Sequence, residues 1–326
     1  MPMKISITSV SGFIGKFLLE ELILLNHDIS ILTRKELPAK HGICNIKGDL
    51  LHEGIALDVF VDGSDVVFHC AGEIKDERLM QQLHVNGTQN LLNAVHASIK
   101  KYGKPVHWVQ LSSVGAYGLD GEGAQSGRTI TESGAEQPKR IYEVSKTASD
   151  QLVHEFALIE PLFSFTIIRP TIVIGTTMPN QSFHAMARMI KRGIFFRIGR
   201  QEAMGNYVHV QDVVRALVKC AYDTRALGKV FIVANDCPLG EVVDALAHAM
   251  QVAPPKLVLP ERILRLLVKL TPPWLKLPLT TARINALTRR THYSSDLIGK
   301  TLGFFPLEPI TASIPRLIAD SSARLA

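Results

Sequence analysis

Short runs of β-branched residues alternate with helical patterns through the first half of this sequence. Five runs have the length and the valine and isoleucine content of strands: Ile5–Thr8, Ile29–Thr33, Ile43–Lys47, Val66–Cys70 and Val106–Leu111. Between several of them apolar residues recur at helical spacing, as in Phe17–Leu25. Strands that are apolar on both faces and separated by helices are typical of parallel sheets covered on both sides. The pattern therefore predicts an α/β fold with a doubly wound parallel sheet.

The second half of the chain is organised differently. A helical pattern spans residues 141–160 and a strand follows at Phe165–Arg169, but the alternation weakens beyond Gly175. Prolines between positions 254 and 278 break the last third into short helices, and the Gly- and Ser-rich residues 115–134 are expected to form a long loop. We therefore predict a sheet domain over 1–175 plus 206–236 and a smaller lobe over 176–205 plus 237–326.

Composition excludes several classes of protein. The 326 residues are 46% hydrophobic and 20% charged, which rules out a disordered chain. No apolar run approaches the ~18 residues of a transmembrane span, and the first residues have a strand pattern instead of that of a signal peptide. The four cysteines are far apart and match no zinc motif, so we expect a cytoplasmic protein without a metal site. The net charge of +6 is scattered along the sequence, which argues against nucleic-acid binding and favours an anionic cofactor or substrate.

The turn after the first strand predicts a dinucleotide site. It runs Thr8-Ser9-Val10-Ser11-Gly12-Phe13-Ile14-Gly15 and opens a helix. Gly12 would let backbone amides approach a pyrophosphate, and Gly15 would let the helix pack closely on the sheet. The helix N-terminus would then meet the negative charge with its free amides. Alone, this motif is also compatible with an ordinary strand–turn–helix.

The end of the second strand discriminates between two cofactors. A carboxylate there would hydrogen bond a ribose 2′-hydroxyl and repel a 2′-phosphate. This strand ends with Thr33-Arg34-Lys35, two cations with no acid before Glu36. We therefore expect NADP to be preferred over NAD, with NAD possible. Asp49, after the third strand, is a candidate acceptor for the adenine amine.

Tyr142 and Lys146 are four residues apart at the start of a helix, so they share one face. A free tyrosine has a pKa of about 10, and lowering it to about 7 requires about 4 kcal/mol of phenolate stabilisation. A neighbouring ammonium and an oxidised nicotinamide ring could supply this together. Lys146 could also hold the nicotinamide ribose, and Ser113, after the fifth strand, could hydrogen bond the substrate oxygen.

Taken in order, these motifs resemble the extended short-chain dehydrogenase/reductase superfamily, which includes NAD-dependent epimerases/dehydratases and 3β-hydroxysteroid dehydrogenase-like proteins. The resemblance covers residues 4 to about 310 and rests on Gly12–Gly15, Gly48–Leu50, Val67–Gly72, Gly87–Leu92, Ser112–Ser113 with Ala116–Gly118, Tyr142 with Lys146, Arg169–Pro170, Tyr207–Asp212, and Leu302–Phe304 with Pro306.

The resemblance implies a Rossmann-type fold with a C-terminal substrate lobe. It implies that Ser113, Tyr142 and Lys146 are catalytic, with Tyr142 as general acid/base for hydride exchange with a small-molecule substrate. The expected cofactor-binding residues are Thr8, Ser11, Gly12, Phe13, Ile14, Gly15, Arg34, Lys35, Asp49, Leu50, Cys70, Ala71, Gly72, Lys146, Arg169 and Pro170. It also implies a homodimer formed through the helices around 80–100 and 141–160.

Three positions depart from the family pattern. Ser9 replaces the first glycine of the turn, and His84 stands where the family's Asn-Val-x-Gly-Thr motif has its asparagine. Cys70 replaces a common aliphatic residue beside the cofactor, and we expect it to be a small buried filler rather than a redox group.

The substrate is less constrained than the cofactor. The asparagine and arginine with which nucleotide-sugar members grip their substrate are absent around Thr171–Ile172 and Met204–Tyr207, although Arg188 or Arg197 could serve a diphosphate instead. We therefore expect an alcohol/ketone oxidoreductase acting on a hydrophobic substrate. The alternatives are a nucleotide-sugar epimerase or dehydratase that retains NAD, and a non-catalytic cofactor-binding relative.

A leucine-rich helix at 261–270 carries a basic stripe of Arg262, Arg265 and Lys269. We expect it to pack on its own lobe with this charged face in solvent. The alternatives are a hydrophobic substrate mouth or peripheral contact with an anionic membrane surface.

Overall fold

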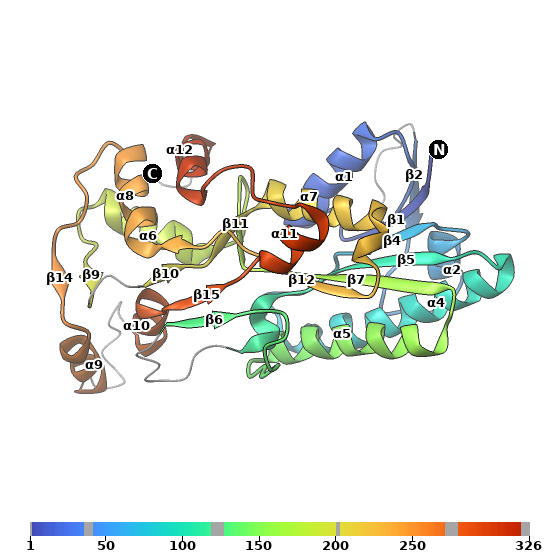
Figure 1. Cartoon of the computed structure of the whole chain (residues 1–326), viewed down its shortest axis with the longest axis horizontal. Coiled ribbons are helices and arrows are strands. Elements are labelled where there is room, and N and C mark those ends of the chain that lie inside the picture. The colour runs from blue at the N-terminus through green and yellow to red at the C-terminus, as the bar shows by residue number, and fades with distance from the viewer. Residues whose placement is uncertain (1, 36–41, 119–126, 200–202, 271–279, 321–326) are drawn as a thin grey trace.

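The computed structural model describes residues 2–35, 42–118, 127–199, 203–270 and 280–320, and its centre is a seven-stranded parallel sheet (Figure 1). The strands are β1 Lys4–Thr8, β2 Asp28–Thr33, β3 Ile43–Lys47, β4 Val66–His69, β5 Val106–Leu111, β7 Phe163–Pro170 and β12 Lys229–Val233. Their order is β12-β7-β5-β4-β1-β2-β3, so the chain winds outward in both directions from β1. Every residue of β4 and β5 is buried, which explains their continuous apolar character.

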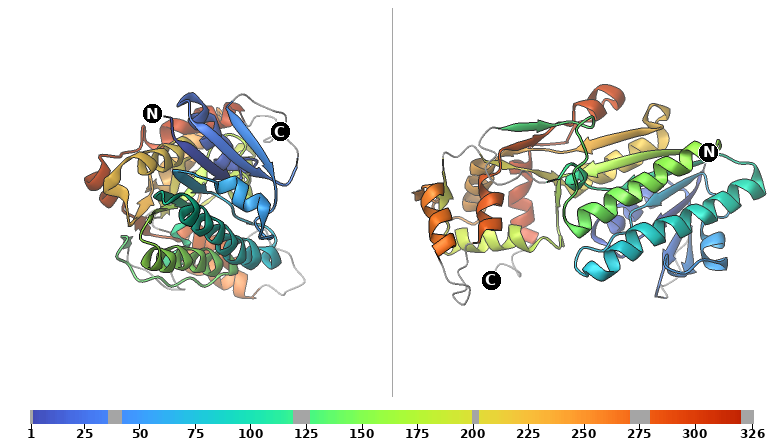
Figure 2. Two further views of the ribbon diagram at one scale, coloured as in Figure 1. Left: turned by 90° about the vertical axis from the view of Figure 1, so that its right-hand side faces the viewer. Right: turned by 90° about the horizontal axis from the view of Figure 1, so that it is seen from below.

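Helices cover both faces of the sheet. On one face lie α1 Phe13–Leu24, α7 Val210–Tyr222 and α11 Asp296–Leu302, whose apolar residues join one buried core. On the other face lie α2 Ile55–Val61, α4 Gly87–Tyr102 and α5 Ile141–Ile159, which share a second core. Figure 2 shows α4 and α5 running side by side along that face. The predicted doubly wound α/β fold is therefore confirmed.

The remaining elements form a smaller lobe beyond the carboxyl ends of the strands (Figure 1). Its helices are α6 Gln181–Lys191, α8 Leu239–Ala249, α9 Glu261–Leu270, α10 Thr281–Thr288 and α12 Ile310–Asp320. Four two-stranded sheets connect it: β8 Ile172–Ile174 with β11 Tyr207–His209, β9 Arg197–Ile198 with β14 Val258–Leu259, β10 Met204–Gly205 with β13 Cys237–Pro238, and β6 Arg128–Ile130 with β15 Thr291–Tyr293. Side chains from α6, α8 and α12 form its own core.

The sequence predictions agree with this architecture except at one segment. The five N-terminal strands begin and end within one residue of the predicted bounds. The loop predicted over 115–134 instead contains the 3-10 helix Val114–Tyr117 and the strand β6, while residues 119–126 lie outside the described part. All seven strands of the main sheet fall within 1–175 and 206–236, and the division into two domains stays a prediction. None of the described helices has the length and apolarity needed to cross a membrane.

Candidate active site

The turn between β1 and α1 is shaped for the close approach of a ligand. Ser9 has a φ of 62°, in the left-handed region, and its carbonyl accepts the Gly12 N–H at 2.9 Å. A Cβ on Gly15 would lie 2.2 Å from that carbonyl oxygen, so only glycine fits there. Ser9 adopts the conformation that glycine favours at the cost of about 1 kcal/mol. The replacement of the first glycine by Ser9 therefore leaves the conformation of the turn intact.

The N-terminus of α1 has a free set of amide donors. Its cap residue Gly12 supplies no side-chain hydrogen bond, and no acidic residue lies in the first turn. Ser11 is exposed beside it, whereas Phe13 and Ile14 are half-buried. Amides and helix dipole thus favour an anion at this point, as a dinucleotide pyrophosphate requires.

Thr8 connects this turn to the loop after β4. Its hydroxyl accepts the N–H groups of Cys70 at 3.0 Å and Ala71 at 3.1 Å, and it lies 3.2 Å from Nδ1 of His69. Thr8 is buried, so we expect it to act on the cofactor site indirectly, by holding this loop in place. Burial raises the pKa of the Cys70 thiol to about 12, as expected of an inert filler. Gly72, the next residue but one, is exposed at the loop surface.

The groups predicted to hold the adenosine end also meet at this edge of the sheet. Gly48 donates its N–H to the Thr33 carbonyl at 3.0 Å, which brings the ends of β3 and β2 together. Arg34 and Lys35 are exposed just beyond β2. The Asp49 carboxylate accepts the Leu51 N–H at 3.1 Å, and Leu50 is buried. Glu36 lies outside the described residues.

Helix α5 presents the two central residues of the site. It begins where the Glu143 carboxylate accepts the N–H groups of Lys139 and Arg140 at 3.0 and 3.1 Å. Lys146, one turn further, is buried with its Nζ 3.5 Å from the carbonyl oxygen of Ala71. Burial lowers the pKa of Lys146, although the charge of Asp150 opposes this shift. The ammonium thus lies against the loop that Thr8 holds.

Tyr142 and Ser113 complete the predicted catalytic set. Burial raises the pKa of Tyr142 to about 12 and the charge of Asp150 adds to this, while a hydrogen bond with the Ser113 side chain lowers it. Ser113 follows β5, and its Oγ also accepts the Gly115 N–H at 3.1 Å. The structure therefore brings Ser113 to Tyr142, which lies one helical turn before Lys146 on α5, and the raised pKa leaves the phenol protonated at neutral pH.

His84 takes part in the same site, although the sequence marks it only as a departure. It lies in a π-helical turn, Gln82–Asn86, between the short helix α3 Glu77–Gln81 and α4. Its Nε2 accepts the Glu73 N–H at 2.9 Å, so Nδ1 carries the proton and donates it to Ser145 Oγ at 2.8 Å. Its ring meets that of Tyr142 edge-on at 5.6 Å. Such π-turns are often found at functional sites, and this one joins the cofactor loop to the first turn of α5.

The stability of the fold is expected to depend on His84 at acid pH. Burial, with the charge of Lys146, lowers the pKa of His84 to about 3, and burial lowers that of His107 to about 4. In the unfolded chain both histidines take up a proton below about pH 6.5, whereas in the folded chain they stay neutral until the pH is much lower. The free energy of unfolding is therefore highest above pH 6.5 and decreases as the pH falls. Each histidine contributes about 1.4 kcal/mol per pH unit to this loss.

Denaturant unfolding at several pH values between neutral and about pH 5 measures the effect. When the free energy of unfolding is plotted against pH, His84→Asn should reduce the slope by the amount that one histidine contributes. His52→Asn, at an exposed position, is the control. An unchanged slope in His84→Asn would show that His84 is already protonated in the folded chain.

A buried ion pair lies directly behind the site. Asp150 of α5 accepts hydrogen bonds from Arg169 Nη2 at 2.9 Å and from Ser112 Oγ at 2.7 Å, and both charged side chains are at most 2% exposed. Arg169 also pairs with Glu136 at 2.6 Å. The guanidinium is thus held by two carboxylates, and a role of Arg169 or Pro170 in cofactor binding stays a prediction.

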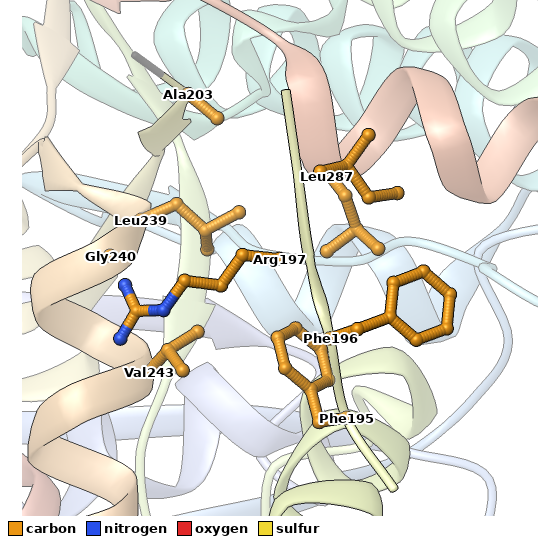
Figure 3. Close-up of a pocket in the computed structure, with 9 residues that line it drawn as sticks. Phe195, Phe196, Arg197, Ala203, Leu239, Gly240, Val243 and Leu287 are labelled. Carbon is orange, nitrogen blue, oxygen red and sulfur yellow. The ribbon is translucent and has the colours of Figure 1, made fainter. Parts of the chain in front are cut away.

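The cations considered for a diphosphate do not form a second site. Arg197 lies on a pocket of about 20 Å³, room for roughly one water molecule. Its guanidinium is directed toward α8 (Figure 3), where it pairs with Asp244, and its Nε donates to the Pro255 carbonyl at 3.0 Å. Arg188 is half-buried in α6. Asn206, near the place of the missing arginine, donates to Asp236 and to the Thr291 carbonyl, both at 2.8 Å.

Known proteins are similar to this chain in sequence and in fold. Residues 5–234 match the family model described as "NAD dependent epimerase/dehydratase family". GDP-6-deoxy-D-mannose reductase of Pseudomonas aeruginosa is 26% identical over 268 residues, which are 77% of this chain and 82% of that protein. Tetraketide alpha-pyrone reductase 2 of Arabidopsis thaliana is 23% identical over 74% of this chain and 81% of that protein.

Solved structures share the fold over the whole chain. MoeE5 in complex with UDP-glucose and NAD has a TM-score of 0.73 at 22% identity, covering 99% of this chain and 100% of that one. RMD from Pseudomonas aeruginosa complexed with NADPH has a TM-score of 0.69 at 23% identity, with the same coverage. Reductases and nucleotide-sugar proteins therefore both occur among the structural neighbours.

Proposed function

Because the chain belongs to the NAD-dependent epimerase/dehydratase family, we propose that it is an NAD(P)-dependent oxidoreductase that transfers a hydride between nicotinamide C4 and the alcohol or ketone carbon of a small hydrophobic substrate. Two contacts support the proposal: Tyr142 hydrogen bonds Ser113, and Lys146, one turn further along α5, contacts the loop that Thr8 ties to the dinucleotide turn. A protein that only bound a cofactor would not need all three side chains, which makes a non-catalytic relative the weaker alternative.

The three residues divide the work. In the reductive direction Tyr142 donates its proton to the substrate oxygen as the carbon accepts a hydride, and its raised pKa keeps that proton available at neutral pH. Ser113 orients the substrate oxygen, and the Lys146 ammonium stabilises the phenolate that remains. A bound nicotinamide would supply the hydride and, once oxidised, a positive charge that favours the phenolate. In the oxidative direction the phenolate has to form first, which costs about 7 kcal/mol from a pKa of about 12 to neutral pH.

Two exposed cations support a preference for NADP. Arg34 and Lys35 follow β2 at the edge where Asp49 lies, and a guanidinium there can hold a 2′-phosphate with charge-assisted hydrogen bonds. Arg34→Ala is expected to weaken NADPH binding by about tenfold or more and to leave NADH binding nearly unchanged. Fluorescence titration of both nucleotides measures this, with NADH as the internal control. Equal losses for the two nucleotides would show that Arg34 does not contact the 2′-phosphate.

A hydrophobic substrate is favoured by the two positions at which nucleotide-sugar members grip their substrate. Ile172, two residues after Pro170, is apolar and 41% exposed, and Asn206 is occupied by structural hydrogen bonds. The names of the relatives support a second candidate, because GDP-6-deoxy-D-mannose reductase and the MoeE5 complex both concern nucleotide sugars. That candidate is an epimerase or dehydratase that retains NAD.

For either function we propose a cytoplasmic homodimer formed through α4 and α5.

One experiment separates these functions. The purified protein is denatured, any released nucleotide is identified, and the cofactor-free protein is titrated with NADPH and NADH. An empty site that prefers NADPH, followed by turnover of hydrophobic ketones or aldehydes, supports the oxidoreductase. Tightly retained NAD with turnover of a nucleotide sugar would instead support the epimerase or dehydratase. If the protein binds neither nucleotide, both proposed functions are wrong.

A further inference from the structure

Helix α9 leaves its apolar face in solvent. Leu264 is its buried contact, packed with Ile198 and Ile284, and Arg265 on the same side donates to Glu261 and to Asn285 Oδ1, each at 2.8 Å. The opposite side is apolar and more than half exposed: Ile263 55%, Leu266 56%, Leu267 53% and Leu270 70%. Leu264 thus packs on the lobe and Arg262 and Lys269 are exposed, as expected from the sequence, but the apolar face of the helix is in solvent as well.

The exposed face continues onto the neighbouring strands. The pairing of β9 with β14 brings Arg197–Ile198 beside Val258–Leu259, and we call the segments 191–198 and 251–270, which contain these strands, the lobe tip. In Figure 1, α9, β9 and β14 lie at the end of the molecule farthest from the main sheet. Three further large apolar side chains are exposed in these segments: Ile194 58%, Leu257 58% and Val258 47%. Apolar exposure on the lobe tip is thus contiguous in sequence and joined by a strand pair.

The lobe tip also holds the charge excess of the protein. It contains seven Lys and Arg residues and one acidic residue, Glu261, which is a net charge of +6. The formal net charge of the whole chain is also +6, so the remaining residues are balanced. Seven of the 36 Lys and Arg residues thus lie in the two segments that also carry the exposed apolar side chains of α9, and one of the seven, Arg197, is paired with Asp244.

We propose that the lobe tip docks on an anionic membrane surface, with α9 lying in the plane of the interface. On a helical wheel Arg262 and Lys269, seven residues apart, form one stripe along the edge of the exposed apolar face. Apolar side chains bordered by cations are the pattern with which an amphipathic helix enters the headgroup region of anionic lipids. The ten residues of α9 span about 15 Å, half of a bilayer core, so the helix lies on the surface.

The charge decides between the occupants that could cover this face. A second copy of the chain would bring one net charge of +6 against another, which disfavours a symmetric contact through the lobe tip. A nucleic acid would satisfy the cations but leave the exposed leucines in water. An anionic lipid surface satisfies both.

The test is co-sedimentation of the full-length protein with vesicles of equal parts phosphatidylserine and phosphatidylcholine, compared with phosphatidylcholine alone. Binding to the anionic vesicles only, weakened by salt, is expected. Arg262→Glu with Lys269→Glu should reduce the partition coefficient by about 25-fold or more, at about fivefold for each lost cation. Leu266→Gln with Leu267→Gln should reduce it by about tenfold or more.

Two control variants make the same kinds of substitution, apolar to glutamine and cation to glutamate, on the sheet domain instead of the lobe tip. Leu24→Gln with Ile55→Gln alters side chains that are 76% and 81% exposed on the sheet domain, and Lys100→Glu with Lys229→Glu reverses two exposed charges there. Both controls should sediment with the vesicles more strongly than the tip variants, and all variants should keep NADPH binding. Failure to bind anionic vesicles, or equal binding by tip and control variants, would overturn the proposal. Light scattering that shows an oligomer lost only in the tip variants, without vesicle binding, would assign the face to a second copy instead.

Discussion

Substitution of Tyr142 by phenylalanine is expected to lower kcat by about 10²–10⁴-fold, the contribution of a positioned general acid. The change removes one oxygen from a half-buried ring and keeps the edge-on contact with His84. The hydroxyl that is lost is the one that hydrogen bonds Ser113. The loss should therefore fall on the chemical step, with nearly unchanged KM for the substrate and unchanged affinity for NADPH.

Tyr222→Phe is the matched control. It also removes a tyrosine hydroxyl, here one that lies 2.8 Å from Nε2 of His27 at the opposite end of the sheet. Steady-state kinetics and NADPH titration of the two variants separate catalysis from folding. If Tyr142→Phe keeps the turnover of the control, another group donates the proton and the proposed role of Tyr142 fails.

The parts of this fold that follow from local sequence are those set by short-range physics. The strands β4 and β5 are recognisable because both faces are buried, which requires continuous apolar runs. Gly15 is recognisable because a Cβ would collide with the carbonyl of Ser9, six residues away. Tyr142 and Lys146 are recognisable because one helical turn fixes their common face.

The parts that sequence leaves undetermined depend on partners far along the chain. His84 reaches Ser145 across 61 residues, so its role is invisible from its own segment. The three-residue strand β6 exists because β15, more than 160 residues later, pairs with it. Helix α9 shows an amphipathic pattern in the sequence, but only the packing of Leu264 decides which face is left outside. In the same way, the sequence does not show that the Arg169 guanidinium pairs with Asp150.

Replacing Arg169 by methionine is expected to reduce the free energy of unfolding by about 3–5 kcal/mol, because it leaves the Asp150 carboxylate buried without its cation. Asp150 is 1% exposed and its other close donor, Ser112, is neutral. The guanidinium also lies over the Tyr117 ring, 5.1 Å from its centroid, so some packing is lost as well. The variant should affect catalysis too, because the charge of Asp150 raises the pKa of Tyr142 and Arg169 is its buried counter-ion.

Denaturant unfolding of three variants separates the effect of the unpaired Asp150 charge from the loss of packing. Arg225→Met removes a surface partner of Asp223, with the arginine side chain 61% exposed, and should destabilise the protein far less than Arg169→Met. Arg169→Met combined with Asp150→Asn removes both buried charges and should be more stable than Arg169→Met alone. Equal losses in the single and double variants would show that the unpaired Asp150 carboxylate is not what destabilises Arg169→Met.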